Sequence, residues 1–265
     1  MPEGLTAIPR VAGALLRASL LTGLQYRADF LADSLTGVLR AAATAAPLGL
    51  VYLHRDEVMG WSAPDAALVL ALFLIMQGIV GGLVEPNLGE VVDGVRNGTL
   101  DLILLKPADA QLLVSLRRLA PARMWDVVVG IAVMAWAIGE VGAPSPLDAG
   151  IAALLLTAGL ASFYSLFLLA ICLSFFFVRV DNLRFLLWSA ADAGRWPITV
   201  FSGWVRWALT VVVPVAILTS FPALALRGQW DASLLAVGCG TALAFVIGSR
   251  LAWTRSLAHY TSASS

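Results

Sequence analysis

The chain has 265 residues, of which 60% are hydrophobic and 13% are charged. Soluble domains carry about 25% charged residues, so this composition excludes an ordinary water-soluble fold and indicates a polytopic membrane protein. The 17 basic and 17 acidic side chains cancel, so the net charge gives no reason to expect nucleic acid as a partner, and we expect none.

Residues 1–33 are predicted to form a helix that lies along the inner membrane surface. Residues 8–29 combine small apolar side chains with Arg10, Arg17 and Arg27, which is typical of an interfacial helix whose basic side chains stay near lipid headgroups. A plain cytoplasmic extension of the first span is the alternative. The apolar piece between Arg10 and Arg17 is too short for a secretory signal, so we expect no cleaved signal peptide.

Six membrane-spanning helices are predicted, within one transmembrane domain over residues 1–265. A helix of about 20 apolar residues crosses a hydrocarbon core roughly 30 Å thick. The predicted spans are residues 34–53, 64–84, 124–142, 149–178, 204–226 and 232–253. The predicted fold class is therefore an all-α polytopic membrane protein.

Basic side chains determine the predicted orientation, because cytoplasmic loops of membrane proteins are enriched in Lys and Arg. With both termini in the cytoplasm, Arg40 lies within a span and Arg55 and Arg227 fall outside. The remaining basic residues, all inside, are Arg10, Arg17, Arg27, Arg96, Lys106, Arg117, Arg118, Arg123, Arg179, Arg184, Arg195, Arg206, Arg250 and Arg255. We therefore expect a multi-pass protein of the bacterial inner (cytoplasmic) membrane with both termini cytoplasmic.

The largest aqueous segment is the inner connection at residues 85–123, where we expect any soluble partner to dock. Pro86 suits the first turn of a helix, and Asn97-Gly98 suits its end. An apolar stripe between them has the spacing of one helix face, and it consists of Leu88, Val91, Val92 and Val95. A short amphipathic helix is predicted here, followed by a second helix at residues 109–120.

Residues 179–206 are open to two interpretations. Their charges favour a helix on the inner surface, and Trp188, Trp196 and Trp204 fit an interfacial location. Alternatively, residues 182–204 form the fifth span or part of a broken, re-entrant element toward the outer side.

Neither a catalytic site nor a metal site is predicted. The sequence has no Gly-x-x-x-x-Gly-Lys-Ser/Thr loop that could hold the phosphates of ATP, so no cofactor is expected in this chain. His54 and His259 are predicted on opposite sides of the membrane, which argues against a His-pair metal site and a Ser-His hydrolase. Cys172 and Cys239 lie within predicted spans, where we expect small apolar side chains rather than disulfides.

Two polar side chains within predicted spans are candidates for a translocation path. Arg40 costs about 2.5 to 3.5 kcal/mol near the bilayer centre, and therefore needs a carboxylate, carbonyl or water partner, or must snorkel inward. Gln77 stands beside Gly78, Gly81 and Gly82, where close helix packing with one interhelical hydrogen bond is the alternative to substrate contact.

The order of motifs in the inner loop resembles the first cytoplasmic loop of ABC-2-type permeases, the membrane subunits of type-2 ABC exporters. The acidic amphipathic helix is followed by Asn97-Gly98-Thr99-Leu100-Asp101 and then by Leu104-Leu105-Lys106-Pro107. Further motifs resemble a small bacterial branch of that family, namely Asp181-Asn182, Arg195-Trp196-Pro197, Val213-Pro214-Val215, Phe221-Pro222-Ala223 and the tail at 260–265.

The resemblance implies a half-transporter. Two permease subunits, identical or homologous, pair in the membrane with two cytoplasmic ABC ATPase subunits, which bind ATP and Mg²⁺ and push on a coupling helix of each permease. The residues implied to dock the ATPase are Leu88, Glu90, Val91, Asp93, Val95, Arg96, Asn97, Gly98, Thr99 and Asp101.

The implied function is outward transport of an unidentified substrate, which is lipid-like, amphipathic or a polysaccharide. An ion-driven secondary transporter is one alternative, although such a protein usually needs carboxylates deep in its spans. A non-transporting membrane scaffold is the other alternative.

Overall fold

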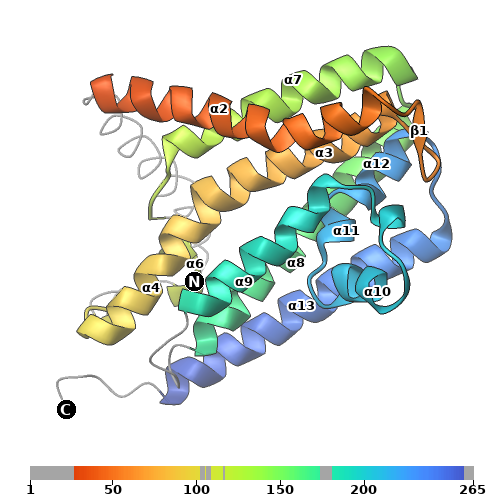
Figure 1. Cartoon of the computed structure of the whole chain (residues 1–265). Helices are drawn as coiled ribbons and strands as arrows, with labels where there is room; N and C mark the ends of the chain where they lie inside the picture. Colours follow the sequence, from red (N-terminus) through yellow and green to blue (C-terminus); the bar gives the residue numbers. More distant parts are fainter. Residues whose placement is uncertain (1–26, 102–104, 106–108, 116, 174–180, 260–265) are drawn as a thin grey trace.

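The computed structural model describes residues 27–101, 105, 109–115, 117–173 and 181–259. Long helices lie roughly side by side, and the described residues contain one small β-hairpin (Figure 1). The predicted all-α polytopic fold is confirmed. The N-terminal interfacial helix expected at residues 1–33 lies almost entirely outside the described residues.

Five described helices are long and apolar enough to cross a membrane, and one bent helix pair is a sixth candidate. The long helices are α2 (Arg27–Tyr52), α3 (Ala63–Ile79), α7 (Met124–Val141), α8 (Pro146–Cys172) and α13 (Ala232–His259). Each overlaps one predicted span. Figure 1 shows that α2 begins, and α13 ends, at the end of the bundle that holds α4 (Glu85–Asn97), which we call the α4 end.

The opposite end, which we call the hairpin end, carries the short connection between α2 and α3. Strand β1 (Glu57–Val58) pairs antiparallel with β2 (Trp61–Ser62). Met59 and Gly60 between them have φ of 51° and 83°, as a tight two-residue hairpin turn requires. The turn thus reverses the chain within a few residues.

Helix α3 lies at the centre of the bundle. Its most apolar window is 78% buried, whereas the corresponding windows of α2, α7 and α13 are 17% buried. Glycines allow α7 to cross α3 closely: a Cβ on Gly130 would lie 2.8 Å from the Ala71 carbonyl oxygen, and one on Gly78 would lie 2.8 Å from the Val127 nitrogen. Real Cβ atoms do not approach backbone atoms this closely, so this packing depends on glycine.

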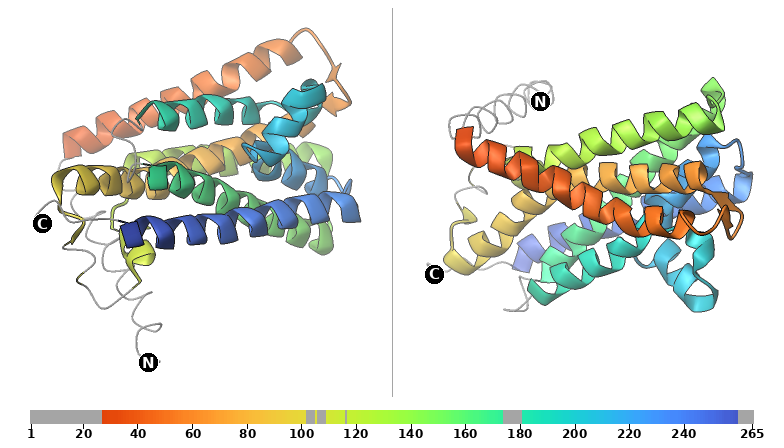
Figure 2. Two further views of the ribbon diagram at one scale, coloured as in Figure 1. Left: turned by 90° about the horizontal axis from the view of Figure 1, so that it is seen from below. Right: turned by 45° about the horizontal axis from the view of Figure 1, so that its top comes forward.

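Residues 181–199 run from the α4 end to the hairpin end beside α8 (Figure 2). The elements are α9 (Asp181–Ala191), η4 (Asp192–Arg195) and η5 (Ile198–Val200). Trp188 packs edge-on against the rings of Phe163 and Phe167, which places α9 against the C-terminal half of α8. Thr199 accepts a 2.9 Å hydrogen bond from the indole of Trp61 at the hairpin end.

The next segment contains α10 (Gly203–Val211), α11 (Val215–Leu218) and α12 (Ser220–Leu226), with a 64° bend after α10. The residues that flank this segment both contact Trp61: Thr199 accepts its indole hydrogen bond, and the Cζ atom of Arg227 lies 4.9 Å from the centroid of its ring. The chain before and after the segment therefore lies at the hairpin end, which favours a re-entrant element over a broken span.

The span predicted at residues 204–226 is a bent pair in the structure, which is a broken span or a re-entrant element. The contacts at Trp61 favour the re-entrant interpretation and a crossing within 182–204. Helix α11 is buried by protein, and a Cβ on Gly194 of η4 would lie 3.2 Å from the Phe73 side chain in α3. Apolar residues that pack inside a protein have the same hydropathy as residues that face lipid, so the sequence pattern could not distinguish the two.

Helix α4 continues α3 directly through a π-helical turn, η1 (Val80–Val84). It has Pro86 in its first turn and ends at Gly98, whose φ of 69° is the left-handed conformation that glycine adopts easily, as predicted. The second helix of the connection, α6 (Ala110–Ser115), is shorter than the predicted 109–120. A 3₁₀ turn, η2 (Pro121–Arg123), then leads into α7.

Candidate functional site

The apolar stripe of α4 faces the protein. Leu88 and Val91 are each 1% exposed, and Val92 and Val95 pack against the same core. Burial of this stripe fixes the rotation of α4 about its axis, because any other rotation would expose these side chains. The amphipathic helix predicted from the spacing is therefore present.

The opposite side of α4 is polar and accessible. Asp93, Asn97 and Thr99 are exposed, Gly98 forms the left-handed end of the helix, and Asp101 is half-buried. Arg96 lies on this helix, but its side chain is outside the described part of the structure. Most of the polar residues implied to dock a partner thus share one accessible surface at the end of the bundle.

Glu90 has a different environment from Asp93. Its carboxylate pairs with two arginines of the returning loop: Oε2 lies 3.4 Å from a terminal nitrogen of Arg117, and Oε1 lies 2.5 Å from Nε of Arg118. Glu90 therefore holds the loop against α4 rather than presenting a free charge.

Asn87 was not identified from the sequence, yet it is central to this contact. Its amide donates to the carbonyls of Leu83 (2.6 Å) and Arg118 (2.7 Å), and its Oδ1 accepts from the backbone N–H groups of Arg117 (2.7 Å) and Arg118 (2.6 Å). A buried asparagine with all these bonds made fixes the path of a loop. The sequence feature that could have identified Asn87 is its position directly before Leu88, where a polar side chain borders the apolar stripe.

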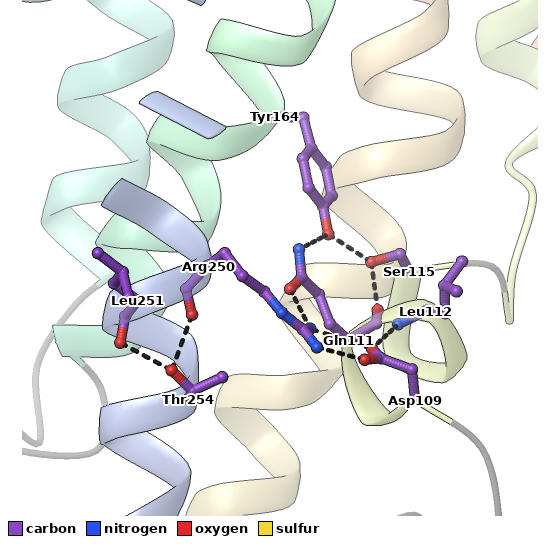
Figure 3. Close-up of polar contacts among 8 residues, drawn as sticks. All are labelled: Asp109, Gln111, Leu112, Ser115, Tyr164, Arg250, Leu251 and Thr254. Carbon is purple, nitrogen blue, oxygen red and sulfur yellow. Dashed lines mark hydrogen bonds and ion pairs between the residues drawn. The ribbon is translucent and has the colours of Figure 1, made fainter. Parts of the chain in front are cut away.

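A second polar cluster ties α6 to the membrane-spanning helices (Figure 3). Arg250 of α13 forms an ion pair with Asp109 and donates to Gln111 Oε1 at 2.8 Å. Tyr164 of α8 bonds to Gln111 Nε2 at 3.2 Å and to Ser115 at 2.7 Å. These residues and Leu112 line an open pocket of about 440 Å³. The inner connection is thereby attached to α4, α8 and α13 at once.

The Asp109 carboxylate makes the stability of this cluster depend on pH. The hydrogen bond from Arg250 holds the pKa of Asp109 below its usual value. The stabilisation is therefore complete above the pKa of the unfolded chain and is lost as pH falls through the folded pKa. We expect Asp109→Asn to lower the free energy of unfolding by about 0.5 to 1 kcal/mol at neutral pH, since both side chains are partly exposed.

Chemical unfolding at several pH values checks this prediction. The difference between the wild type and Asp109→Asn should shrink below about pH 4, where the wild-type carboxyl group also becomes neutral. Asp56→Asn, which alters an exposed carboxylate in the loop before the hairpin, is the control. A difference that is constant across pH would contradict the role given to the ion pair.

Comparison with protein families identifies the chain. A family described as "ABC-2 family transporter protein" matches residues 39–264. The chain belongs to the ABC-2 transporter family. No match was found among the curated proteins or the solved structures searched. The resemblance of the inner loop to ABC-2 permeases is confirmed, and the ABC-2 family protein is a membrane component of transport.

Arg40 of this ABC-2 family protein has a carboxylate partner, one of the options that the sequence left open. Its terminal nitrogen lies 2.9 Å from Oδ2 of Asp126 on α7, whose side chain is 0% exposed. Beside this pair, the indole of Trp125 donates to Ser34 at 2.8 Å. Arg40 therefore fastens α2 to α7, a role that the position of Asp126 near the end of its span did not suggest.

Gln77, the other candidate for a translocation path, lies in α3 and is half-buried. Its Oε1 is buried and has no hydrogen-bond partner in the described structure. The three glycines that follow it face the start of α7. A role for Gln77 in transport stays a prediction.

In the part of the ABC-2 family protein that the structure describes, no cluster of three or more His, Cys, Asp or Glu side chains could hold a metal ion.

Proposed function

We propose that the chain is the permease subunit of an ATP-binding cassette exporter, which moves its substrate outward with energy from ATP hydrolysed by separate ATPase subunits. One observation carries the proposal: α4 is a direct helical extension of α3, with its apolar stripe buried and its polar surface accessible. A partner that pushes on this surface would act on the most buried helix of the bundle. Membership of the ABC-2 family supports this arrangement.

The distribution of basic residues supports a cytoplasmic position for α4. The described arginines at the α4 end include Arg117, Arg118, Arg123, Arg250 and Arg255. The hairpin end carries Arg55 and Arg227, and Arg227 is paired with Asp65 at 2.9 Å. Arg195 and Arg206 were predicted inside but belong to η4 and α10, which follow α9 toward the hairpin end, so the excess of basic residues at the α4 end is smaller than the sequence count. Positive charge accumulates on the cytoplasmic side of membrane proteins, which gives an ATPase access to α4. ATP and Mg²⁺ would bind in that partner.

A second permease subunit, identical or homologous, completes the proposed assembly in the bacterial inner membrane. Large apolar side chains are exposed on helices around the bundle, including Leu35 and Leu39 on α2, Ile131 on α7, and Leu243 and Ile247 on α13. In a membrane these surfaces contact lipid or the second permease. The proposed substrate class is lipid-like, amphipathic or polysaccharide.

Reversal of charge on the accessible surface of α4 tests the proposal. In a complex of the permease with its ATPase, reconstituted in lipid, we expect Asp93→Arg to lower transport per ATP hydrolysed by about tenfold, because loss of roughly 1.4 kcal/mol of docking energy weakens the contact by this factor. Transport into vesicles and phosphate release are measured together.

Glu140→Arg is the matched control, since it makes the same change of charge at an exposed position toward the other end of the bundle. It should leave coupling unchanged. Full transport by the isolated chain, driven by an ion gradient without an ATPase, would reject the proposal in favour of a secondary transporter.

A further inference from the structure

The junction between α3 and α4 has a specific cause in the sequence. In an uninterrupted α-helix, the N–H of residue 86 would donate to the carbonyl of Gly82, but Pro86 has no N–H and its ring would clash with that carbonyl. The chain instead forms the π turn η1, in which the N–H of Glu85 donates to the carbonyl of Val80, five residues earlier. The π turn keeps α3 and α4 in one continuous helix despite the proline.

The Gly82 carbonyl is used by another part of the chain. It accepts a 2.9 Å hydrogen bond from the backbone N–H of Ala120, the residue just before η2 and α7. The loop lies close to both glycines of the turn: a Cβ on Gly81 would lie 3.3 Å from Cδ of Arg123, a tight contact, and one on Gly82 would lie at an ordinary contact distance of 3.5 Å from the Ala120 oxygen. The loop before α7 therefore rests directly on the π turn.

The parts on either side of η1 are each fixed to other elements by specific contacts. On one side, α3 is locked against α7 by the close approaches at Gly78 and Gly130. On the other side, α4 is bound to residues 117–118 through Asn87 and Glu90. Between them lies a turn with two glycines, the residue type with the greatest backbone freedom, and with π-type hydrogen bonding.

We propose that η1 is the flexion point between α3 and α4, and that the hydrogen bond from Ala120 to Gly82 transmits movement of α4 to α7. The inference rests on the proposed function, because the ATPase supplies the push on α4. Movement of α4 carries the loop at 117–120 with it, and this loop leads through η2 to Asp126, the partner of Arg40. One displacement of α4 thus reaches α2 as well as α3 and α7.

Pro86→Ala tests the inference, because alanine supplies the missing N–H to Gly82 and lets the helix become continuous. Hydrogen exchange on the purified permease should show the Ala120 amide exchanging about five to ten times faster, the factor expected when one hydrogen bond is lost. Pro146→Ala is the matched control, because Pro146 lies in the first turn of α8, where no N–H donor is needed.

A second measurement follows α4 directly. Spin labels at Gly89 on α4, which is half-buried and outside the implied docking residues, and at the exposed Thr254 on α13 are introduced after replacement of Cys172 and Cys239 by alanine. In the complex with the ATPase, ATP should shift the distance between the labels in the parent chain. In Pro86→Ala the shift should fall at least about twofold, because the stiffer α-helical junction bends less.

The outcomes separate the inference from the proposed function. An ATP-driven shift of equal size in the parent chain and in Pro86→Ala would overturn the flexion point but leave the proposed function in place. Unchanged protection of the Ala120 amide in Pro86→Ala would overturn the transmission to α7. If ATP shifts nothing in the parent chain, the proposed function fails.

Discussion

Replacement of Arg40 by leucine is expected to lower the free energy of unfolding by about 3 to 5 kcal/mol, the cost of leaving a buried charge without its partner. Asp126 is 0% exposed and its Oδ1 already lacks a hydrogen-bond partner in the described structure, so without the guanidinium this buried carboxylate loses its ion-pair contact. Unfolding in detergent or lipid, followed by tryptophan fluorescence, measures the loss. The effect should exceed that of any single surface change described above.

The double variant Arg40→Leu with Asp126→Leu is the decisive comparison. Removal of both charges leaves no buried carboxylate without a partner, so most of the stability lost in Arg40→Leu should return. Arg55→Leu, which removes an exposed arginine near the hairpin end, should change stability by no more than about 0.5 kcal/mol. If Arg40→Leu alone is as stable as the wild type, the ion pair does not fasten α2 to α7.

Replacement of Gly130 by leucine is expected to cost about 3 kcal/mol and to reduce the amount of folded protein in the membrane sharply, since overpacking forces backbone shifts. The new Cβ would meet the Ala71 carbonyl oxygen at 2.8 Å and the Ile75 nitrogen at 3.0 Å. These are backbone atoms of the most buried helix, so they cannot move aside as the end of a flexible side chain can. Size-exclusion chromatography and thermal unfolding measure the effect.

Gly139 provides the control within the same helix. A Cβ there has no heavy atom within 4 Å, so Gly139→Leu should be neutral or slightly stabilising, because leucine favours the helix more than glycine does. Equal effects at Gly130 and Gly139 would contradict the close crossing of α3 and α7.

Local patterns in the sequence were sufficient for the elements that depend on near neighbours. Hydropathy located the long helices, and Gly98 marked the end of α4 because a helix end needs a left-handed residue that glycine adopts easily. The spacing of Leu88 and Val91 gave the rotation of α4, since side chains three to four residues apart share one helix face. The motifs around Asn97 also led to the ABC-2 family, which the comparison over residues 39–264 confirmed.

Prediction was incomplete where distant residues meet. Pro86 was interpreted as the start of a separate helix, whereas the structure continues α3 through η1 and pairs the Gly82 carbonyl with Ala120. Glu90 was assigned to docking, whereas the arginines that neutralise it lie at positions 117–118. In each case the local helix was predicted correctly, but the residues that bond to it, Ala120 and the two arginines, lie about 30 or more positions further along the chain.

The sequence by itself determined that this is an all-α membrane protein with an amphipathic helix at one end, because composition and periodicity act over a few turns of helix. The ABC-2 family came from the resemblance of its motifs, which the family comparison confirmed. The tertiary structure alone decided that Asp126 is the partner of Arg40 and that residues 203–226 form a bent pair whose flanking residues both contact Trp61. The physical reason is that hydropathy measures how apolar a segment is. Whether its neighbour is lipid or protein depends on how the helices pack.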